Sequence, residues 1–355
     1  MRRELPILGR GAETNPPNRF EPLRYELDQE AWSDEEAPSP RTEFLVDSSR
    51  SIITYNDSPD VGFSAGVNPY RGCEHGCAYC YARPYHEYLG FSAGLDFESK
   101  ILVKTEAPEL LRKELLSPKW QPQVLGMSGV TDCYQPIERH LKLIRRCLEV
   151  LVEFRNPVAI VTKNRLVARD VDLLAELAKV RAAAVFISLT TLDESLRRRL
   201  EPRTSSVAGR LEAIRTLKQA GVPVGVMIAP VIPALNDHEI PRLLEAAVQA
   251  GAGFCGWTML RLPLGVADLF SAWLERHFPE RKDKVLARIR EVRGGRLNDS
   301  RFGSRMRGQG VIAETIRRMF QLHRDRLGLP SGMPALSTAA FRRPTPSQPT
   351  LFPLS

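Results

Sequence analysis

Short apolar runs alternate with amphipathic stretches along most of the chain, and this alternation restricts the fold more than any other sequence feature. The runs are continuously apolar, as in AVFISL and VGVMIA, which is typical of parallel strands buried on both faces. They recur about every 25–40 residues, the length of one βα unit. The expected strands are Lys100–Lys104, Val124–Val130, Val158–Thr162, Ala183–Thr190, Pro223–Ala229 and Phe254–Leu260.

The stretches between these runs carry apolar residues at helical spacing, and Gly221 and Gly251 stand where helix C-caps are expected. About six βα units favour an α/β fold of the partial (β/α)6 barrel type over an open doubly wound sheet. In either fold the functional site lies at the carboxyl ends of the strands. The expected helices are Glu138–Arg155, Arg169–Val180, Val207–Ala220 and Glu239–Ala250.

The two ends of the chain differ in composition from the middle. Residues 1–58 are rich in proline and charge, which predicts a poorly ordered, flexible extension with one short strand at Thr42–Val46. Residues 330–355 combine Pro, Ser and Thr and should form a loosely ordered tail. The barrel core is therefore expected at 59–280, followed by a basic helical extension at 281–329.

Composition excludes several classes of protein. With 355 residues, 43% of them hydrophobic and 26% charged, the chain can bury a core of useful size, as two domains or one domain with extensions. No apolar stretch approaches the roughly 18–20 residues that span a bilayer, so no membrane partner is expected. The amino-terminal apolar run is too short for a secretory signal. Six cysteines are too sparse for a disulfide scaffold, which points to the reducing cytoplasm.

The net charge of +8 is regional. Residues 1–59 hold seven Lys and Arg against twelve Asp and Glu, whereas 281–307 hold ten against three. Arginine dominates that basic segment, and its planar fork suits phosphate, so a nucleic acid partner would explain it. The alternative is a solvated helix and flexible loop that balance the acidic amino-terminal extension. Only Phe302 is aromatic there, so base stacking is not evident.

Three cysteines lie within eight residues of the segment 68–83. Cys73, Cys77 and Cys80 have the spacing C-x3-C-x2-C, and soft thiolates at this density favour a metal over a disulfide. Three ligands are one short of a closed cluster, so a cubane would keep one iron open. The alternative is a structural zinc loop with His75 as fourth ligand. A second CxxC or HxxxH pattern is missing, so the iron–sulfur interpretation is favoured.

This loop, with an aromatic residue just before its third cysteine, resembles the signature of the radical S-adenosylmethionine (SAM) superfamily. The segments GVTDCYQPIE (129–138), VTKN (161–164) and ISLTTLDESLRRRLEPRT (187–204) are similar to the branch of spore photoproduct lyase and its uncharacterised bacterial relatives. The resemblance implies a radical SAM barrel with a 4Fe–4S cluster whose open iron binds SAM. It also implies reductive cleavage to a 5′-deoxyadenosyl radical, with an electron donor such as flavodoxin or ferredoxin.

Residues at the strand ends match positions of that branch which bind SAM. The resemblance makes Lys163 the partner of the methionine carboxylate and assigns the amino group to Thr131 and Asp132. Other roles remain open for these residues: a helix cap for Asp132 and a solvated strand end for Lys163. The resemblance also makes Ser188 a contact of the ribose or the methionine, although its side chain could instead bond only to backbone. It places the backbone around Tyr79 at the adenine edge, and Pro230 would line the adenine slot.

Arg203 follows a strand and a short helix, where it could meet an anion of cofactor or substrate. The alternative is an ion pair with Glu201 or another surface carboxylate.

One position departs from the lyase pattern. Gly129 stands where spore photoproduct lyases carry a hydrogen-donating cysteine, which favours a reaction other than repair of the thymine photoproduct. The leading hypothesis is a radical SAM enzyme, lyase-like or a transferase, whose unidentified substrate includes nucleic acid as a candidate. A second hypothesis applies the same radical chemistry to a protein or a small metabolite. A third is a non-catalytic, metal-stabilised nucleic-acid-binding protein.

Overall fold

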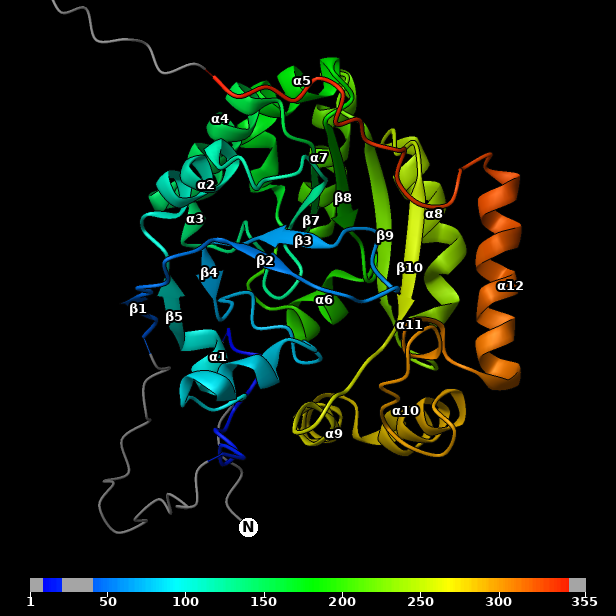
Figure 1. The fold of residues 1–355 in the computed structure, drawn as a ribbon. Helices are drawn as coiled ribbons and strands as arrows, with labels where there is room; N and C mark the ends of the chain where they lie inside the picture. The colour runs from blue at the N-terminus through cyan, green and yellow to red at the C-terminus, as the bar shows by residue number, and fades with distance from the viewer. Residues whose placement is uncertain (1–8, 21–40, 345–355) are drawn as a thin grey trace, which may run out of the picture.

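The computed structural model describes residues 9–20 and 41–344 and contains two β-sheets within that part of the chain (Figure 1). The larger sheet has seven strands in the order β10-β9-β8-β7-β6-β3-β2. Neighbouring strands pair in parallel except β2, which is antiparallel to β3. Its strands are β2 (Ile53–Tyr55), β3 (Ala65–Val67), β6 (Leu125–Met127), β7 (Val158–Thr162), β8 (Ala183–Ser188), β9 (Val224–Val231) and β10 (Cys255–Met259).

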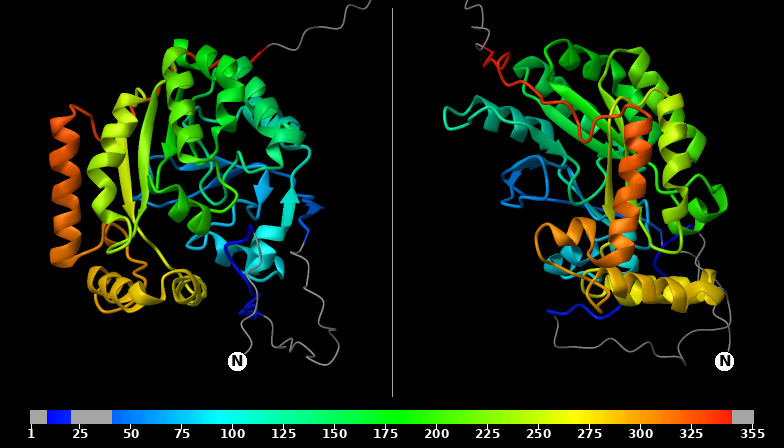
Figure 2. Two further views of the ribbon diagram at one scale, coloured as in Figure 1. Left: turned by 180° about the vertical axis from the view of Figure 1, so that it is seen from behind. Right: turned by 90° about the vertical axis from the view of Figure 1, so that its right-hand side faces the viewer.

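Helices connect the parallel strands and cover one face of the sheet, its convex face (Figure 2). The sheet does not close between β3 and β10, so the fold is the expected partial (β/α)6 barrel. The covering helices are α4 (Leu143–Phe154), α5 (Val171–Lys179), α7 (Val207–Gln219), α8 (Ile240–Gln249) and α12 (Gly310–Arg326). Beyond the carboxyl ends of the strands lie α6 (Glu194–Leu200), α9 (Val266–His277), α10 (Pro279–Val292) and α11 (Ser304–Arg307).

The opposite, concave face of the sheet is only partly covered. Along β9 and β10, residues that point toward the helices are buried in the main core. The residues between them, Met227, Ala229, Gly256 and Thr258, are partly exposed. Because side chains alternate between the two faces of a strand, this pattern leaves an accessible surface inside the barrel. The expectation that the strands are buried on both faces is therefore wrong for β9 and β10.

The first strand of the parallel sheet differs from the prediction. The expected strand at Lys100–Lys104 forms β5 (Lys100–Val103), which lies between β1 (Glu43–Val46) and β4 (Tyr70–Arg71) in a separate three-stranded sheet. The first parallel strand is instead β3, only three residues long. Its Cα register pairs it with β6 from Ala65 opposite Leu125 to Val67 opposite Met127. So short a strand gives no periodic signal in the sequence.

Two other elements have different bounds from those expected. The helix predicted over Glu138–Arg155 divides into α3 (Glu138–Leu141) and α4 because Lys142 adopts a left-handed conformation, with φ of 53°. The strand predicted over Val124–Val130 ends at Met127, since Ser128 already has φ of 101°. The chain leaves β6 there and forms a loop at the carboxyl edge of the sheet.

The expected flexible extension is partly ordered against the core. Within it, β1 and β2 belong to the two sheets, and β1 matches the predicted strand at Thr42–Val46. Residues 9–20 pack beside α1 (Leu95–Ser99): the Leu95 N–H donates to the Thr14 carbonyl at 3.2 Å, and Asn15 exchanges hydrogen bonds with Asp96. Residues 1–8 and 21–40 lie outside the described part.

The expected loose tail is ordered from 330 to 344 and runs across the amino ends of the strands (Figure 1). Ser331 forms a parallel bridge with Cys255, and the Arg342 N–H donates to the Phe154 carbonyl at 2.9 Å. Met333 and Leu336 pack against the aromatic pair Phe186 and Phe254. The tail therefore covers the end of the barrel opposite the predicted site. Residues 345–355 lie outside the described part.

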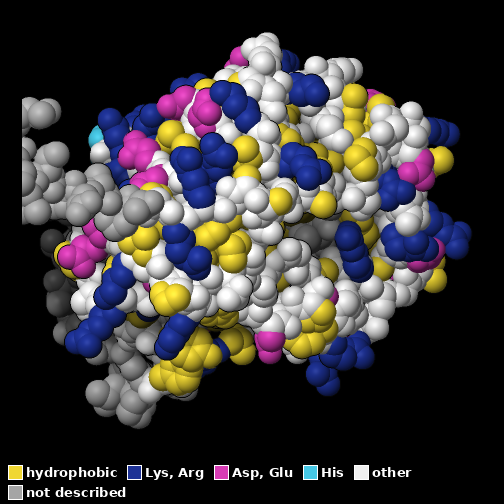
Figure 3. All heavy atoms as spheres, turned by 45° about the horizontal axis from the view of Figure 1, so that its top comes forward, with side chains coloured by type: hydrophobic (Ala, Val, Ile, Leu, Met, Phe, Trp, Pro, Cys, Tyr) yellow, Lys and Arg dark blue, Asp and Glu magenta, His cyan; other side chains and the backbone are white. Residues whose placement is uncertain are grey.

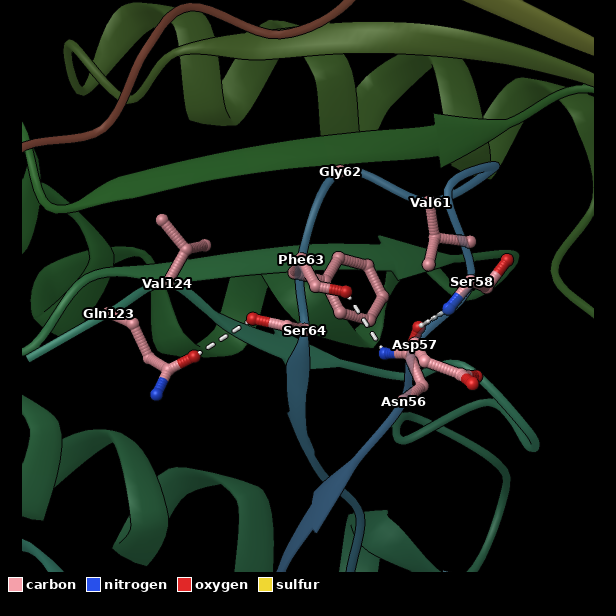
Figure 4. Close-up of a pocket in the computed structure, with 9 residues that line it drawn as sticks. All are labelled: Asn56, Asp57, Ser58, Val61, Gly62, Phe63, Ser64, Gln123 and Val124. Atoms are coloured by element: carbon pink, nitrogen blue, oxygen red, sulfur yellow. Dashed lines mark hydrogen bonds between the residues drawn. The ribbon is translucent and has the colours of Figure 1, made fainter. Parts of the chain in front are cut away.

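The loop between β2 and β3 crosses toward the far edge of the sheet. Its Phe63 ring fills the space above Gly126 of β6, where even a Cβ atom would lie 2.2 Å from the ring (Figure 4). The Asn56 side chain braces the loop by donating to the Phe63 carbonyl at 3.0 Å. At its tip, Asp60 accepts from the Gly303 N–H at 2.7 Å. The loop thus joins β3 to the residues that precede α11.

A pocket of about 420 Å³ lies under this loop, lined by residues 56–58, 61–64, 123 and 124 (Figure 4). None of the predicted site residues lines it.

Within the described residues, no helix combines the length and apolar character that crossing a bilayer requires.

Candidate active site

The cysteine loop lies at the carboxyl ends of the parallel strands, between β4 and the short helix η1 (Arg83–Leu89). Cys73 and Cys77 are only 6% and 7% exposed, and Cys80 is half-buried. The loop is anchored to the barrel because the Ala78 N–H donates to the Leu200 carbonyl at 3.0 Å, at the end of α6. Gly76, with φ of 64°, supplies the turn between the first two cysteines.

A buried ion pair supports the loop from below. The Arg83 guanidinium has no exposed surface; it donates twice to the Cys77 carbonyl, at 2.9 and 3.2 Å, and once to the Gly94 carbonyl at 2.9 Å. Its partner is the equally buried Glu98 carboxylate. A buried charge needs both a counter-ion and satisfied hydrogen bonds, and Arg83 has both. The pair therefore fixes the backbone that carries Cys77.

The amino-terminal segment completes this support. The N–H groups of Gly11 and Ala12 donate to the Glu98 carboxylate at 2.9 and 2.7 Å. Gly11 lies against Gly76 so closely that a Cβ atom would be 1.7 Å from the Gly76 carbonyl oxygen. Only glycine permits this backbone contact. Residues 10–12 thus form part of the wall around the cysteine loop.

The cysteine side chains suit an iron–sulfur cubane better than a single ion. Among residues 9–20 and 41–344, no three His, Cys, Asp or Glu side chains converge on one metal position. A tetrahedral zinc site requires such convergence, whereas a cubane binds each thiolate through a different iron. Burial raises the pKa of Cys73, Cys77 and Cys80, so these thiols must release protons when a metal binds.

His75, the fourth ligand of the zinc alternative, is occupied by protein contacts. Its ring is 1% exposed, with Nδ1 3.4 Å from the Asp132 carboxylate and Nε2 3.3 Å from the Asn164 side-chain amide. Both ring nitrogens therefore face other side chains, and the structure gives no support to the zinc alternative.

Asp132 joins the ends of β6 and β7. Its carboxylate accepts from the Thr162 hydroxyl and the Lys163 N–H, each at 2.7 Å, and from the Tyr134 N–H at 2.9 Å. Burial alone would raise the pKa of Asp132, but the His75 ring and these hydrogen bonds hold it below its usual range. The carboxylate is therefore ionised and bonded to protein groups on both oxygens.

Thr131 is held in the same way. Its hydroxyl donates to the Tyr70 carbonyl at 3.1 Å, and the Asn68 amide donates to both Thr131 oxygens at 2.8 Å. Asn68 directly follows β3, so this contact joins the start of the cysteine loop to the loop after β6.

Lys163 lies in a buried polar network rather than at a solvated strand end. Its ammonium group donates to the Ala229 carbonyl at 2.8 Å and lies 3.5 Å from the Glu201 carboxylate. Glu201 is fully buried and also accepts from Arg210, Thr190 and the Tyr79 hydroxyl. Burial would raise the pKa of Glu201, but Arg210 and Lys163 hold it far below its usual range. Two cations and one anion leave this network with one net positive charge.

The same network reaches Ser188 and Pro230. Ser188 is 3% exposed, and its carbonyl accepts from the Arg210 guanidinium at 2.9 Å. Pro230 follows the carbonyl that Lys163 contacts, and its own carbonyl accepts from Asn236 at 3.0 Å. The structure therefore brings the strand-end candidates and Tyr79 to one edge of the sheet.

Arg203 lies apart from this network. Its guanidinium pairs with Glu74 at 3.0 Å and donates to the Thr42 hydroxyl at 3.3 Å. The geometry corresponds to the ion-pair alternative, although the carboxylate is Glu74 and not Glu201.

Sequence reasoning missed the groups that hold the site together: Glu201, Arg210, Thr190, Asn68, Arg83 and Glu98. Thr190 and Glu201 lie inside the segment ISLTTLDESLRRRLEPRT, and Arg210 follows it closely, so a local signal for these three existed. Asn68 and Arg83 bond to residues outside the cysteine segment, and no local signal could reveal those contacts.

A partial barrel with a buried three-thiol loop at the carboxyl ends of its strands is the arrangement of an α/β enzyme with a metal centre at its site. Residues 67–247 match the Radical SAM superfamily, and this is half of the chain. The protein therefore belongs to the radical SAM superfamily, and its cofactors are a 4Fe–4S cluster and SAM.

Known proteins resemble the chain to different degrees. An uncharacterised protein of Mycobacterium tuberculosis is 38% identical over 234 residues, covering 65% of this chain and 67% of that protein. The radical SAM Nα-GlyT isomerase of Pseudomonas phage M6 is 27% identical over 188 residues, covering 52% of this chain and 37% of the isomerase. A spore photoproduct lyase variant shares the fold, with a TM-score of 0.57 and 16% identity over 81% of this chain and 80% of the lyase.

Proposed function

We propose that this protein is a radical SAM enzyme that abstracts hydrogen from a nucleic acid substrate, with Cys73, Cys77 and Cys80 holding the cluster. The observation that carries the proposal is the buried cysteine loop at the carboxyl edge of the sheet, beside the positively charged network of Lys163, Glu201 and Arg210. When bound and reduced, a 4Fe–4S cluster held by these three cysteines would supply the electron for the reductive cleavage of SAM. The protein supplies binding, orientation and exclusion of water.

The network can orient an anionic group at the site. Lys163 is held by the Ala229 carbonyl and Glu201, so its ammonium position is fixed before any ligand arrives. The one excess positive charge fits the carboxylate of the methionine moiety. Ser188, Pro230 and the backbone around Tyr79 border the same edge, where they would contact the ribose, methionine and adenine parts. Thr131 and Asp132 position the loops that flank them.

Electron paramagnetic resonance of the anaerobic, reduced protein tests the cofactor assignment. A 4Fe–4S signal that changes when SAM is added is the expected result, because three cysteine ligands would leave one iron free to bind the cofactor. A zinc-containing, colourless protein, or a signal indifferent to SAM, would contradict the proposal and return the metal to a structural role.

Lys163→Met should weaken SAM binding about ten- to a hundredfold, because a hydrogen bond to a charged group contributes about 1.5–3 kcal/mol. Isothermal titration of the reconstituted, unreduced protein measures this. Lys179→Met is the matched control, since that lysine is exposed on α5 and pairs with Glu176. Equal affinities for the two variants would remove Lys163 from the SAM site.

Two observations support nucleic acid as the substrate class. Solved lyase structures of the same fold contain a dinucleoside spore photoproduct. This chain adds a net charge of +8, concentrated near its carboxyl terminus. A polynucleotide held by several arginines should bind more weakly as salt rises, with log K falling linearly against log salt. Fluorescence anisotropy with a labelled oligonucleotide tests this dependence.

An enzyme that cleaves SAM but binds no oligonucleotide at low salt would instead act on a protein or a small metabolite.

The remaining assignments follow from the same proposal. Radical SAM enzymes need a reductant, and a flavodoxin or ferredoxin would serve here. The described cysteines are all free thiols, in keeping with a cytoplasmic enzyme. Gly129 lies in the loop after β6, so the lyase's hydrogen-donating thiol has no equivalent at that position. We therefore expect a lyase-like or transferase reaction other than thymine photoproduct repair.

A further inference from the structure

Three arginines from two separate segments of the chain lie at the carboxyl end of β10. Arg261 follows β10, whereas Arg305 and Arg307 belong to α11 in the basic segment 281–307. Arg293 donates to the carbonyl just before Arg261 and to the first carbonyl of α11, and so joins these two elements. Figure 1 shows α11 beside the end of β10. We call Arg261, Arg305 and Arg307 the arginine rim.

Each guanidinium of the rim lies over an aromatic ring. Such a contact uses the flat face of the guanidinium and leaves N–H groups at its edge for an acceptor. The arginine side chains are therefore oriented while retaining donors. The guanidinium carbon lies 4.7 Å from the ring centre for Arg261 over Tyr81, 4.4 Å for Arg305 over Phe302 and 4.8 Å for Arg307 over Trp257.

The rim has an excess of positive charge. Asp60 pairs with Arg305, but among the described residues no carboxylate lies within 4.0 Å of Arg261 or Arg307. Burial and the neighbouring Arg305 lower the pKa of Arg261. Arg261 and Arg305 repel each other, and Asp60 offsets only one of these two charges, so an additional anion would be stabilised here. Planar N–H forks of this kind match the oxygens of phosphate.

The rim borders the cysteine loop directly. Tyr81 follows the proposed ligand Cys80, and its hydroxyl donates to the Gly129 carbonyl in the loop after β6. Tyr81 is 38% exposed and Phe302 is 56% exposed. Exposed rings beside cationic groups are the features that bind single-stranded nucleic acid, because bases stack on the rings and phosphates meet the cations. Besides Phe302, the structure thus places a second exposed ring, that of Tyr81, against an arginine of the rim.

The rest of the basic segment has a different environment. On α10, Lys282 pairs with Glu275 at 2.7 Å and Arg288 pairs with Glu291 at 2.9 Å. On the opposite side of the molecule, where the amino ends of the strands come forward in Figure 3, Lys and Arg side chains are spread over the face and do not gather in one patch. The helical part of the segment thus fits the alternative of a solvated surface. Arg305 and Arg307 are the residues of the segment that belong to the rim beside the cysteine loop.

We propose that the arginine rim, with Tyr81 and Phe302, binds a single-stranded segment of the substrate and presents one nucleotide to the concave face. The arginines hold backbone phosphates, and the two exposed rings stack on flanking bases. This inference rests on the proposed nucleic acid substrate and adds the residues and the strand state that it requires.

The test measures binding of a fluorescein-labelled single-stranded oligodeoxynucleotide to the cluster-loaded protein over a range of salt. Arg261→Gln and Arg307→Gln should each weaken binding about tenfold and reduce the slope of log K against log salt by about one. Phe302→Ala should weaken binding about tenfold without changing the slope, because stacking releases no counterions. A duplex of the same sequence should bind more weakly than the single strand.

Arg290→Gln is the matched control, since Arg290 is exposed on α10 in the same basic segment and loses the same charge. It should keep the unaltered affinity. Arg307→Lys keeps the positive charge but lacks the planar guanidinium group. It should therefore keep the slope of log K against log salt and bind the oligonucleotide more weakly. Cluster absorbance and the unfolding midpoint verify that each variant is folded.

Different results would overturn different parts of the argument. If Arg290→Gln weakens binding as much as the rim variants, or the rim variants bind normally, the inference falls and the nucleic acid substrate stands. If the unaltered protein binds no oligonucleotide, the proposed substrate class falls together with the inference.

Discussion

Cys77→Ala is expected to abolish reductive cleavage of SAM. Cys77 is the middle residue of the cysteine loop, and its backbone is fixed by the Arg83 guanidinium. Two remaining thiolates cannot hold three irons of a cubane, so the variant should lose both the iron–sulfur absorbance and the cleavage product. Anaerobic reconstitution, iron analysis and detection of 5′-deoxyadenosine after reduction with dithionite measure these effects.

Cys147→Ala is the control for this experiment. Cys147 is also a buried free thiol, but it lies on α4 in the main core. It should keep the full iron content and the full cleavage rate, with only the modest stability loss of a small core truncation. Retention of SAM cleavage by Cys77→Ala would show that this loop does not hold the cluster.

Glu98→Gln should be the most destabilising of these substitutions. Glu98 neutralises the fully buried Arg83 and accepts hydrogen bonds from the Gly11 and Ala12 N–H groups. Removing one partner of a buried ion pair leaves an uncompensated charge, which costs about 3–5 kcal/mol. The free energy of unfolding from urea denaturation should fall by that amount, and the cysteine loop should lose its support.

Glu176→Gln provides the comparison for an exposed pair. Glu176 pairs with Lys179 on the surface of α5, where about half of each side chain or more is exposed. Such pairs contribute at most about 1 kcal/mol. Similar losses of stability for Glu98→Gln and Glu176→Gln would mean that the Arg83–Glu98 pair does not fix the loop.

The sequence is informative about the fold wherever its signal is local. The strand over Val158–Thr162 has the bounds expected from its apolar run, and the partial barrel follows from the repetition of such units. Strand β3 was not predicted because three residues carry no periodicity. The strand at Lys100–Val103 was placed in the wrong sheet, because an apolar run does not specify its pairing partner.

The candidate site shows the same division. Lys163 and Asp132 could be chosen because polar residues at strand ends meet at one edge of a parallel sheet. Their pairing could not be predicted, since Glu201 lies beyond the next strand and reaches Lys163 only through the tertiary fold. Arg261 and Tyr81 lie far apart in the sequence, so their contact could not be predicted from it either.

Composition was a poor guide to the two ends of the chain. Residues 9–20 contain little apolar surface, yet their backbone hydrogen bonds to Glu98 and α1 hold them against the core. Such contacts depend on where buried acceptors such as the Glu98 carboxylate lie in the fold, and the composition of a segment does not give their positions.

The contact of residues 10–12 with the cysteine loop has a consequence for biosynthesis. These residues leave the ribosome well before Glu98, to which the Gly11 and Ala12 N–H groups donate. Contacts this distant in sequence form late in folding. The wall around the cysteine loop is therefore completed only after Glu98 and the strands beside it have reached their positions.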